Sequence, residues 1–455
     1  MTSNTSDSLH FEELGCVTDA EALFGRIASK PWAVWLDSGG SDRWSVLATE
    51  PRATLVTRGR ETRVATRTAA WSSGEDPFTL IRRLMPAVQP RCPLPFAGGA
   101  IGYCAYDFGH RLNELPGRDA RRPGLPDLAF GIYDVALVID HETGTANLVG
   151  PDSGPALRGL RERWKQRLAA AAQPCRDSGG YRVLHPLTPQ IGESEYLDSV
   201  ATIKRYIHDG DCYQVNYAQP FRARIAGDPA ALYRDLRAAA AAPFGAYLNL
   251  PFAQILSASP ERFLKLEARQ VETQPIKGTR PRSADPSIDR RNARMLARSA
   301  KDRAENLMIV DLLRNDLGKV CRTGSIRVPR LFELKSFYNV HHLVSTVTGT
   351  LADGNDAWDL LAACLPGGSI TGAPKRRAME IIDELEILPR EIYCGSIGYV
   401  SADGTMDTNI AIRSAVHRGG EVTVWGGGGI VADSSPAEEY RESLDKISGF
   451  QTLLS

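Results

Sequence analysis

Paired cysteines are absent from this sequence. The eight cysteines are spread over all 455 residues, and no two of them have the C-x-x-C spacing. A disulfide framework or a thiolate metal site would need cysteines in pairs or clusters. We therefore interpret most of these cysteines as small buried hydrophobic residues.

The chain also lacks an excess of one charge and any long apolar run. Lysine plus arginine and aspartate plus glutamate number 54 each, so there is no basic excess that would favour nucleic acid as a partner. No apolar run approaches the roughly 20 residues that cross a bilayer. The first residues, Met1 to Ser8, have neither the basic nor the apolar region of a signal peptide. The sequence thus predicts a cytoplasmic protein with no nucleic-acid or membrane partner.

Two regions with different patterns divide the chain. The first region has short β-type runs at 44–48, 132–139 and 146–149. An Arg- and Ala-rich helix is expected over about 155–172, and a Gly-, Ser- and Pro-containing loop follows it. We place the boundary near residues 174–190, with an N-terminal region at 1–175 and a second domain at 190–455.

The second region mixes helical and β-type patterns. Apolar residues at helical spacing from Tyr196 to Ile207 predict a helix, and the extended segment that follows has Gln214 and Asn216 on one face. Three later runs separated by glycine turns predict an antiparallel meander, at 393–400, 406–415 and 422–425. The expected fold class is α+β, with large antiparallel sheets in a sandwich flanked by helices.

The segment 303–316 has apolar residues on nearly every face of a helix. A helix of this kind is expected to be buried, which would bring Glu305, Asp311 and Arg314 partly inside. A buried charge needs a partner, a metal or a ligand. The pattern alone leaves two alternatives open, an internal salt-bridge network and a binding site.

A capping box at Ser435–Glu438, with proline at the first helical position, predicts a helix that carries Glu438, Glu442 and Lys446 along one stripe. Such a stripe is usually a solvated face with an i,i+4 ion pair. The preceding run Gly426–Gly429 favours the alternative of a site, because glycines let backbone N–H groups approach a ligand anion.

Three further segments carry side chains whose role spacing does not define. The Gly-rich loop Leu365–Lys375 opens a helix and could receive a carboxylate, but it lacks the spacings of nucleotide-binding loops. His341 and His342 are adjacent, so on a strand they face opposite sides and at most one faces a site. Glu261 fits either a site or an ion pair with its neighbour.

Taken together, these segments resemble the chorismate-utilising enzymes, the family of anthranilate synthase component I, aminodeoxychorismate synthase component I, isochorismate synthase and salicylate synthase. The resemblance is dense over residues 190–450 and looser at 36–38 and 98–103. The matching motifs are S-P-E-R-F at 259–263, P-I-K-G-T at 275–279, A-E-N-L-M-I-V-D-L-L-R-N-D at 304–316, P-G-G-S-I-T-G-A-P-K at 366–375, Y-C-G-S-I-G-Y at 393–399 and G-G-G-I-V-A-D-S at 427–434.

The resemblance implies an active site between sheets, one Mg²⁺ ion and the dicarboxylate chorismate as substrate. The two glutamates that carry the metal in the family match Glu305 and Glu442, and oxygen ligands suit Mg²⁺. Arg413, expected in a strand over 409–413, has a planar guanidinium that fits a carboxylate. The full set that matches the family's substrate site is Gly278, Thr279, Arg314, Ser369, Tyr393, Arg413, Gly427, Gly428, Gly429 and Lys446.

Two positions distinguish the reactions within the family. Members that add water are similar to one another in using a lysine where this chain has Gln214. Anthranilate synthases look like P-I-A-G-T, whereas members that make 4-amino-4-deoxychorismate have a lysine, here Lys277. The resemblance therefore implies amination of chorismate at C4, toward p-aminobenzoate and folate. The alternatives are anthranilate synthase component I and a catalytically silent, tryptophan-sensing subunit.

The implied mechanism begins with attack of neutral Lys277 on C2 of chorismate. Glu261 matches the general acid that assists loss of the C4 hydroxyl, and His342 matches a histidine with a part in the same step. Ammonia then attacks C4 and expels the lysine. An ordinary lysine has a pKa of about 10.4, so its surroundings must lower that pKa, while Glu261 must keep a proton.

The resemblance also implies partners. No Cys-His-Glu amidotransferase module is recognisable, so ammonia is expected from a separate glutamine amidotransferase subunit, component II. Members of the family can also hold a buried tryptophan in the N-terminal region. Its surroundings match Ser38, Arg43, Trp44, Pro243, Phe244 and Gly245, although the loop between Ser38 and Trp44 is shorter than in typical members.

Overall fold

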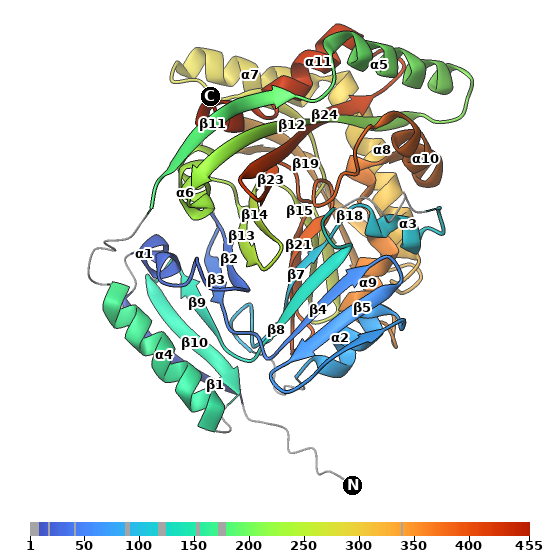
Figure 1. The fold of residues 1–455 in the computed structure, drawn as a ribbon. Helices are drawn as coiled ribbons and strands as arrows, with labels where there is room; N and C mark the ends of the chain where they lie inside the picture. The colour runs from blue at the N-terminus through green and yellow to red at the C-terminus, as the bar shows by residue number, and fades with distance from the viewer. Residues whose placement is uncertain are drawn as a thin grey trace.

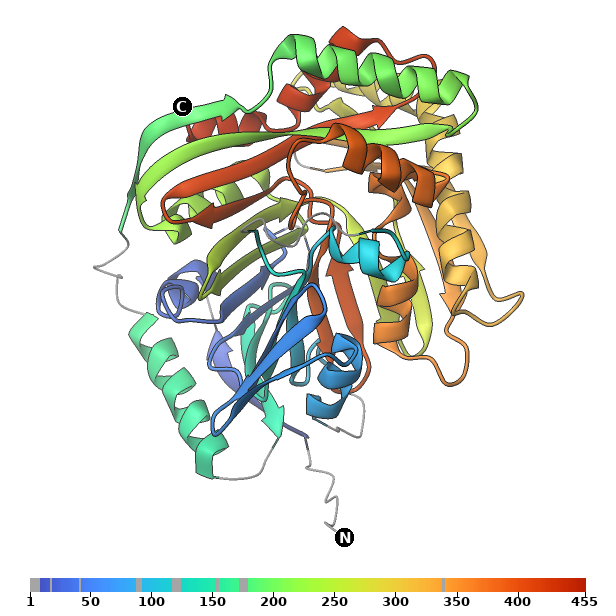
Figure 2. The same cartoon turned by 45° about the vertical axis from the view of Figure 1, so that its right-hand side comes forward.

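Two large antiparallel sheets make up most of the molecule, and helices lie around them (Figures 1 and 2). The computed structural model describes residues 9–16, 19–40, 42–86, 92–116, 124–151, 155–171, 179–337 and 340–455. Within these ranges no helix is long and apolar enough to cross a membrane. The predicted α+β fold class is confirmed.

The first sheet contains 12 strands of the described chain. Its order is β1 (Leu9–Cys16), β10 (Thr145–Pro151), β9 (Ala136–Asp140), β3 (Trp44–Ala48), β2 (Ala33–Asp37), β13 (Phe244–Leu250), β14 (Ala253–Ser259), β23 (Ser414–Arg418), β24 (Glu421–Ile430), β12 (Gln214–Gly227) and β11 (Tyr181–Pro189), with β20 (Gly372–Ala373) beside β12.

The second sheet also has 12 strands in the part that the structure describes. Its order is β17 (Ile276–Pro281), β19 (Val340–Thr350), β16 (Gln270–Thr273), β15 (Arg262–Glu267), β22 (Met406–Asn409), β21 (Ser396–Ser401), β7 (Gly99–Cys104), β8 (Leu128–Tyr133), β4 (Ala53–Arg58), β5 (Glu61–Thr66) and β6 (Ala70–Ser73), with β18 (Arg327–Ser336) beside β19.

Helices cover the outer faces and edges of the two sheets. Helices α5 and α11 pack on β12 and β24 at the top of Figure 1, and α8 packs on β17 and β19. The helices are α1 (Ala20–Gly25), α2 (Pro77–Leu84), α3 (Phe108–Leu112), α4 (Pro155–Ala171), α5 (Glu193–His208), α6 (Pro229–Ala240), α7 (Pro286–Arg298), α8 (Ala300–Gly318), α9 (Ala357–Cys364), α10 (Lys375–Leu385), α11 (Pro436–Asp445) and α12 (Ser448–Leu453), with a short 3₁₀ helix η1 (Gly368–Ile370).

Residues on both sides of the predicted boundary share the two sheets. In the first sheet β2 pairs with β13, and in the second β7 pairs with β21. The larger apolar core likewise takes side chains from both regions, including Tyr133, Val215 and Ile397. The division into domains at 1–175 and 190–455 stays a prediction. The site described below depends on both sheets.

Several predicted elements are confirmed. The run at 44–48 forms β3, and the two expected helices correspond to α4 and α5. In α5 the buried residues Tyr196, Val200 and Ile203 follow the predicted apolar stripe. This helix was predictable because its apolar residues recur at helical spacing.

Two runs predicted as single strands are broken where the chain passes from one sheet to the other. Residues 132–139 belong to β8 of the second sheet and β9 of the first. The expected C-terminal meander is also wrong, because β21 and β22 pair in the second sheet while β23 and β24 pair in the first. Arg413, predicted in a strand, lies in the connecting segment with a φ of 50°. An apolar run looks the same in either sheet, so its pattern does not reveal the crossing.

Candidate active site

A bulge in β17 shapes the loop that carries Lys277. Ile276 pairs with Val344 and Thr279 with His342, and the register shifts between them. Gly278 has a φ of 83°, and a Cβ there would lie 2.7 Å from the side chain of Leu296. Only glycine fits this position without displacing α7. The bulge directs Lys277 toward η1, where its Nζ donates to the backbone carbonyl of Ser369 at 3.0 Å.

Glu261 lies on the opposite side of Ser369, in the turn between β14 and β15. Its side chain is buried, and it accepts hydrogen bonds from the Ser369 hydroxyl and the Ile276 amide. Burial raises the pKa of Glu261 to about 7, although the charge of Lys277 acts in the other direction. Ser369 therefore contacts both groups, through its hydroxyl on one side and its carbonyl on the other.

The same burial lowers the pKa of Lys277. Desolvation is the largest cause, and the nearby ammonium of Lys446 adds to it, while Glu305 and Glu261 oppose it. A low-dielectric pocket disfavours the charged form of an amine and of a carboxylic acid alike. Lys277 and Glu261 thus both shift toward their neutral forms.

Carboxylates from two helices converge beside this pair. Glu305 comes from α8 and is largely buried, and burial raises its pKa, with Glu442 adding to the rise. Glu439 and Glu442 come from α11, and a Cβ on Gly428 would lie 3.1 Å from Glu439 and 3.2 Å from Glu442. The absence of a side chain on Gly428 lets α11 approach β24 this closely.

Lysines neutralise only part of the negative charge of these three glutamates. Glu442 pairs with Lys446 at 2.6 Å, and this charge is the largest cause that lowers the pKa of Glu442. Glu439 is buried; its Oε1 accepts from Ser434, but no described residue donates to its Oε2. Across the described ranges, no three His, Cys, Asp or Glu side chains already stand in metal-ligand geometry.

The glycine run lies inside β24 rather than in a loop, which corrects the expected anion loop at a helix entrance. Gly427 turns its carbonyl to Lys446, whose Nζ donates to it at 2.8 Å, so the Gly427 carbonyl points away from β12. In a strand the N–H of a residue points to the same side as its carbonyl, and residue i+2 repeats that direction. Gly427 and Gly429 therefore present N–H groups toward Lys446, whereas Gly428 turns toward β12.

A cation and a neutral histidine lie close to each other beside the Lys277 loop. Arg413 is partly buried, and no described side chain forms an ion pair or hydrogen bond with its guanidinium. Burial and the charge of Arg413 lower the pKa of His342 to about 4, and His342 Nδ1 lies 2.9 Å from the Thr279 hydroxyl. His341 turns the other way, to Asp289 and Ser336, so the two histidines face opposite sides of β19, as expected for neighbours on a strand.

Gln214 completes the described wall at the start of β12. It is fully buried, and a Cβ on Gly429 would lie 2.0 Å from its amide nitrogen. Neither atom of its amide has a hydrogen-bond partner among the described residues. Tyr393 is also buried, with its ring stacked on Trp425. The amide of Gln214 is therefore free to contact a ligand, whereas the Tyr393 hydroxyl forms a hydrogen bond with Cys394.

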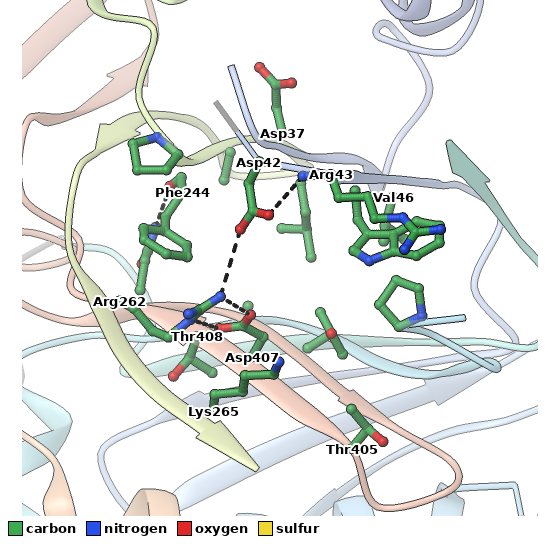
Figure 3. A pocket seen from close by; sticks show the side chains of 18 of the residues that line it. Asp37, Asp42, Arg43, Val46, Phe244, Arg262, Lys265, Thr405, Asp407 and Thr408 are labelled. Carbon is green, nitrogen blue, oxygen red and sulfur yellow. Dashed lines mark hydrogen bonds and ion pairs between the residues drawn. The ribbon is translucent and has the colours of Figure 1, made fainter. Parts of the chain in front are cut away.

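A cavity of about 420 Å³ lies between the two sheets (Figure 3), and none of the site residues named above lines it. Of the residues predicted around a tryptophan, those that line it are Arg43, Trp44, Pro243, Phe244 and Gly245. Ser38 is buried and its hydroxyl has no described partner, but it is not among the lining residues. Arg262 crosses the cavity over Phe244 and bonds to Asp407 at 3.1 Å.

Comparison with known proteins places this site in a family. The family model described as chorismate binding enzyme matches residues 32–452. The chain belongs to the chorismate-binding enzymes. It is 45% identical over 437 residues to aminodeoxychorismate synthase component 1 of Salmonella typhimurium (strain LT2), and the match covers 94% of each chain. It is 46% identical over 439 residues to the protein of the same name from Klebsiella aerogenes, covering 94% of this chain and 95% of that one.

The solved structures include an anthranilate synthase component I from Streptococcus pneumoniae TIGR4. It matches with a TM-score of 0.77 at 31% identity, covering 90% of this chain and 92% of that one. The arrangement of the two sheets is therefore the one found in a solved relative.

Two expectations about this chorismate-binding enzyme are wrong. Arg314 is 54% exposed and pairs with Asp311, itself 60% exposed, so neither has the partly buried position predicted for it. The apolar pattern of α8 overstated its burial, because Leu307 also faces solvent. Ser435 caps α11 without a side-chain hydrogen bond, so the capping box is not formed. Thr279 reaches the site only through its hydroxyl, since the residue as a whole is exposed.

The structure adds Glu439 to the site. The sequence pattern had instead suggested Glu438, on one stripe with Glu442 and Lys446. Glu438 is exposed, whereas Glu439 lies one turn before Glu442 and shares its face. The i,i+3 spacing of Glu439 and Glu442 was a usable signal. Polar residues lie on more than one face of α11, so the sequence does not show which face turns toward the site. The sequence alone therefore did not decide between the two glutamates.

We predict that Ser369→Ala raises the pKa of Glu261 above about 7. The Ser369 hydroxyl donates to the ionised carboxylate and so lowers that pKa, and its removal leaves burial less opposed. Carboxyl-labelled ¹³C NMR of glutamate, assigned with Glu261→Gln, measures the midpoint. Ser369→Thr keeps a hydroxyl and should keep the midpoint. A lower midpoint in Ser369→Ala would contradict this hydrogen bond.

Proposed function

We propose that this enzyme converts chorismate and ammonia to 4-amino-4-deoxychorismate and water. The observation that carries the proposal is a partly buried lysine, Lys277, held by Ser369 beside the acid Glu261 and next to Glu305. The relatives named aminodeoxychorismate synthase component 1, at 45% and 46% identity, support it. The cytoplasmic location of the enzyme stays a prediction.

In the first displacement the neutral amine of Lys277 attacks C2 of the chorismate ring. A C2–N bond forms, the two ring double bonds shift, and the C4–O bond breaks. Glu261 gives its proton to the departing hydroxyl, which leaves as water. The lowered pKa of Lys277 and the raised pKa of Glu261 supply the amine and the acid that this step needs near neutral pH.

In the second displacement ammonia attacks C4 of the Lys277 adduct. The double bonds shift back and the C2–N bond to Lys277 breaks, which returns the lysine as an amine. Nitrogen ends at C4, where the hydroxyl was, because the two shifts cancel. Direct attack of ammonia on C2 would instead lead toward anthranilate. Gln214 has no ionisable group to deprotonate water, which agrees with ammonia rather than water as the second nucleophile.

Cationic and N–H groups around the pocket suit the two carboxylates of the substrate. Arg413 offers a guanidinium that no described acid occupies, and Gly427 and Gly429 present N–H groups on the open edge of β24. Lys446 lies between them and Glu442. His342, with a pKa lowered to about 4, is neutral near pH 7 and adds a hydrogen-bonding group without charge.

The carboxylates fit a magnesium ion. Glu305 and Glu442 are the residues that would hold it. The buried Oε2 of Glu439 nearby has no hydrogen-bond donor among the described residues and could contact the ion or one of its waters. Hard oxygen ligands suit Mg²⁺, which keeps several waters. When bound, Mg²⁺ would supply positive charge for a substrate carboxylate and further disfavour the protonated form of Lys277.

Two partners complete the proposal. Ammonia would come from a separate glutamine amidotransferase subunit, which agrees with the name component 1 of the relatives. Tryptophan is proposed as the occupant of the cavity between the two sheets, whose aromatic and charged lining includes Trp44, Phe244 and Arg43. The unpartnered hydroxyl of the nearby Ser38 supports a polar ligand at its edge.

We expect the purified chain to form 4-amino-4-deoxychorismate from chorismate, Mg²⁺ and ammonium. Turnover should fall as the pH rises above about 7, because Glu261 then loses its proton. It should also fall at lower pH, where Lys277 gains a proton. Mass spectrometry identifies the product, and aminodeoxychorismate lyase should convert it to p-aminobenzoate. Fluorescent anthranilate formed without lyase, or product from glutamine with this chain alone, would refute the assignment.

We expect Glu305→Gln or Glu442→Gln to weaken metal binding at least about tenfold, because each removes a ligand charge. Electron paramagnetic resonance of Mn²⁺ measures the dissociation constant, and the urea midpoint checks the fold. Glu438→Gln is the matched control, because Glu438 lies on the same helix but the glutamates that lie against Gly428 are Glu439 and Glu442. Unchanged metal affinity in both site variants would rule out the two-glutamate site.

A further inference from the structure

Helix α7 turns a row of arginines to the solvent. Arg290, Arg291, Arg294 and Arg298 line a hollow of about 520 Å³ together with Ser287 and Met295. Arg291, Arg294 and Arg298 are spaced by three and four residues, and Arg290 lies four residues before Arg294, so the four arginines share one broad face of the helix. All four arginines are exposed, and none forms an ion pair or hydrogen bond with any residue in the described ranges.

The opposite face of α7 is tied to the loop that carries Lys277. Leu296 is fully buried and packs directly against Gly278. Asp289, the acidic residue of the first turn, accepts from Arg282 at 2.9 Å and lies 3.0 Å from His341. The only acid within α7 is therefore used on the inner side, and it leaves the outer arginines without a counter-ion.

Several arginines on other helices are paired with acids. Arg163 and Arg167 of α4 both meet Glu50, and Arg376 of α10 faces Glu380. The acidic and basic residues of the whole chain balance at 54 each, so the row on α7 is a local excess. Like charges one turn apart destabilise a helix. A partner with acidic groups would remove that repulsion.

We propose that the arginine face of α7, defined as Arg290, Arg291, Arg294 and Arg298, is the docking surface for an acidic face of the glutamine amidotransferase subunit. This rests on the proposed function, which needs ammonia made on another chain. Because α7 covers the catalytic loop, a subunit bound there lies beside the pocket that consumes ammonia. Figure 1 shows α7 at the outer edge of the molecule.

Exposed apolar side chains on the same helix favour a protein as the partner of the arginine face. Met295 is 55% exposed and Ile288 is 39% exposed. Protein interfaces combine apolar anchors with arginine, and both residue types are enriched there. Nucleic acid would be held mainly by charge, which the balanced chain does not offer over a wide surface.

The test is charge reversal with Arg290→Glu/Arg294→Glu, and Arg205→Glu/Arg376→Glu is the matched control on α5 and α10. Fluorescence anisotropy of the labelled amidotransferase subunit from the same organism measures the dissociation constant. It should rise at least about tenfold in the α7 variant and stay within about twofold in the control. The ammonium-dependent rate should not change in either variant, which shows that the fold is kept.

A milder pair, Arg290→Gln/Arg294→Gln, should weaken binding less, and the wild-type affinity should fall with added salt more steeply than that of the variants. An unchanged dissociation constant in the α7 variant, or an equal loss in the control, would overturn the docking surface. So would failure of the wild-type chain to bind the subunit, or loss of a bound DNA 20-mer as the only effect of the α7 variant. Binding without any ammonium-dependent product would instead contradict the proposed function.

Discussion

Burial of Lys277 and Glu261 in one pocket is the condition on which the chemistry depends. In water the two groups would form a charged pair, and then neither could attack carbon nor donate a proton. Desolvation disfavours both charges, so it lowers one pKa and raises the other to about 7. The neutral amine and the neutral acid become accessible together, which neither residue would achieve alone near neutral pH.

The fold produces this pocket by bringing backbones closer than side chains would allow. Gly278 lets α7 pack on the Lys277 loop, and Gly428 lets α11 place two glutamates beside it. The segment after β22 then crosses from one sheet to the other and carries Arg413 between them. Residues from both sheets and from the helices around them thus lie close together in this pocket, although they are far apart in the chain.

Sequence reasoning reached the fold class and most of the candidate site, but for different reasons. Lys277, Glu261, Glu305 and Glu442 were assigned through motifs, and the structure brings them together. Apolar residues at helical spacing predicted α5, and an Arg- and Ala-rich composition predicted α4. Arg314 was misplaced because an apolar run does not show which face of α8 is left uncovered. The sheet crossings were missed because strand patterns carry no information on which sheet accepts them.

The covalent step is tested most directly by trapping the enzyme with chorismate and Mg²⁺ in the absence of ammonium. Digestion and mass spectrometry should then find a peptide with Lys277 that carries chorismate less one water, and added ammonium should remove it. Lys277→Arg should lose turnover, because arginine stays protonated and cannot attack. Near-native turnover in Lys277→Arg, with no adduct on the wild-type peptide, would contradict a nucleophilic lysine.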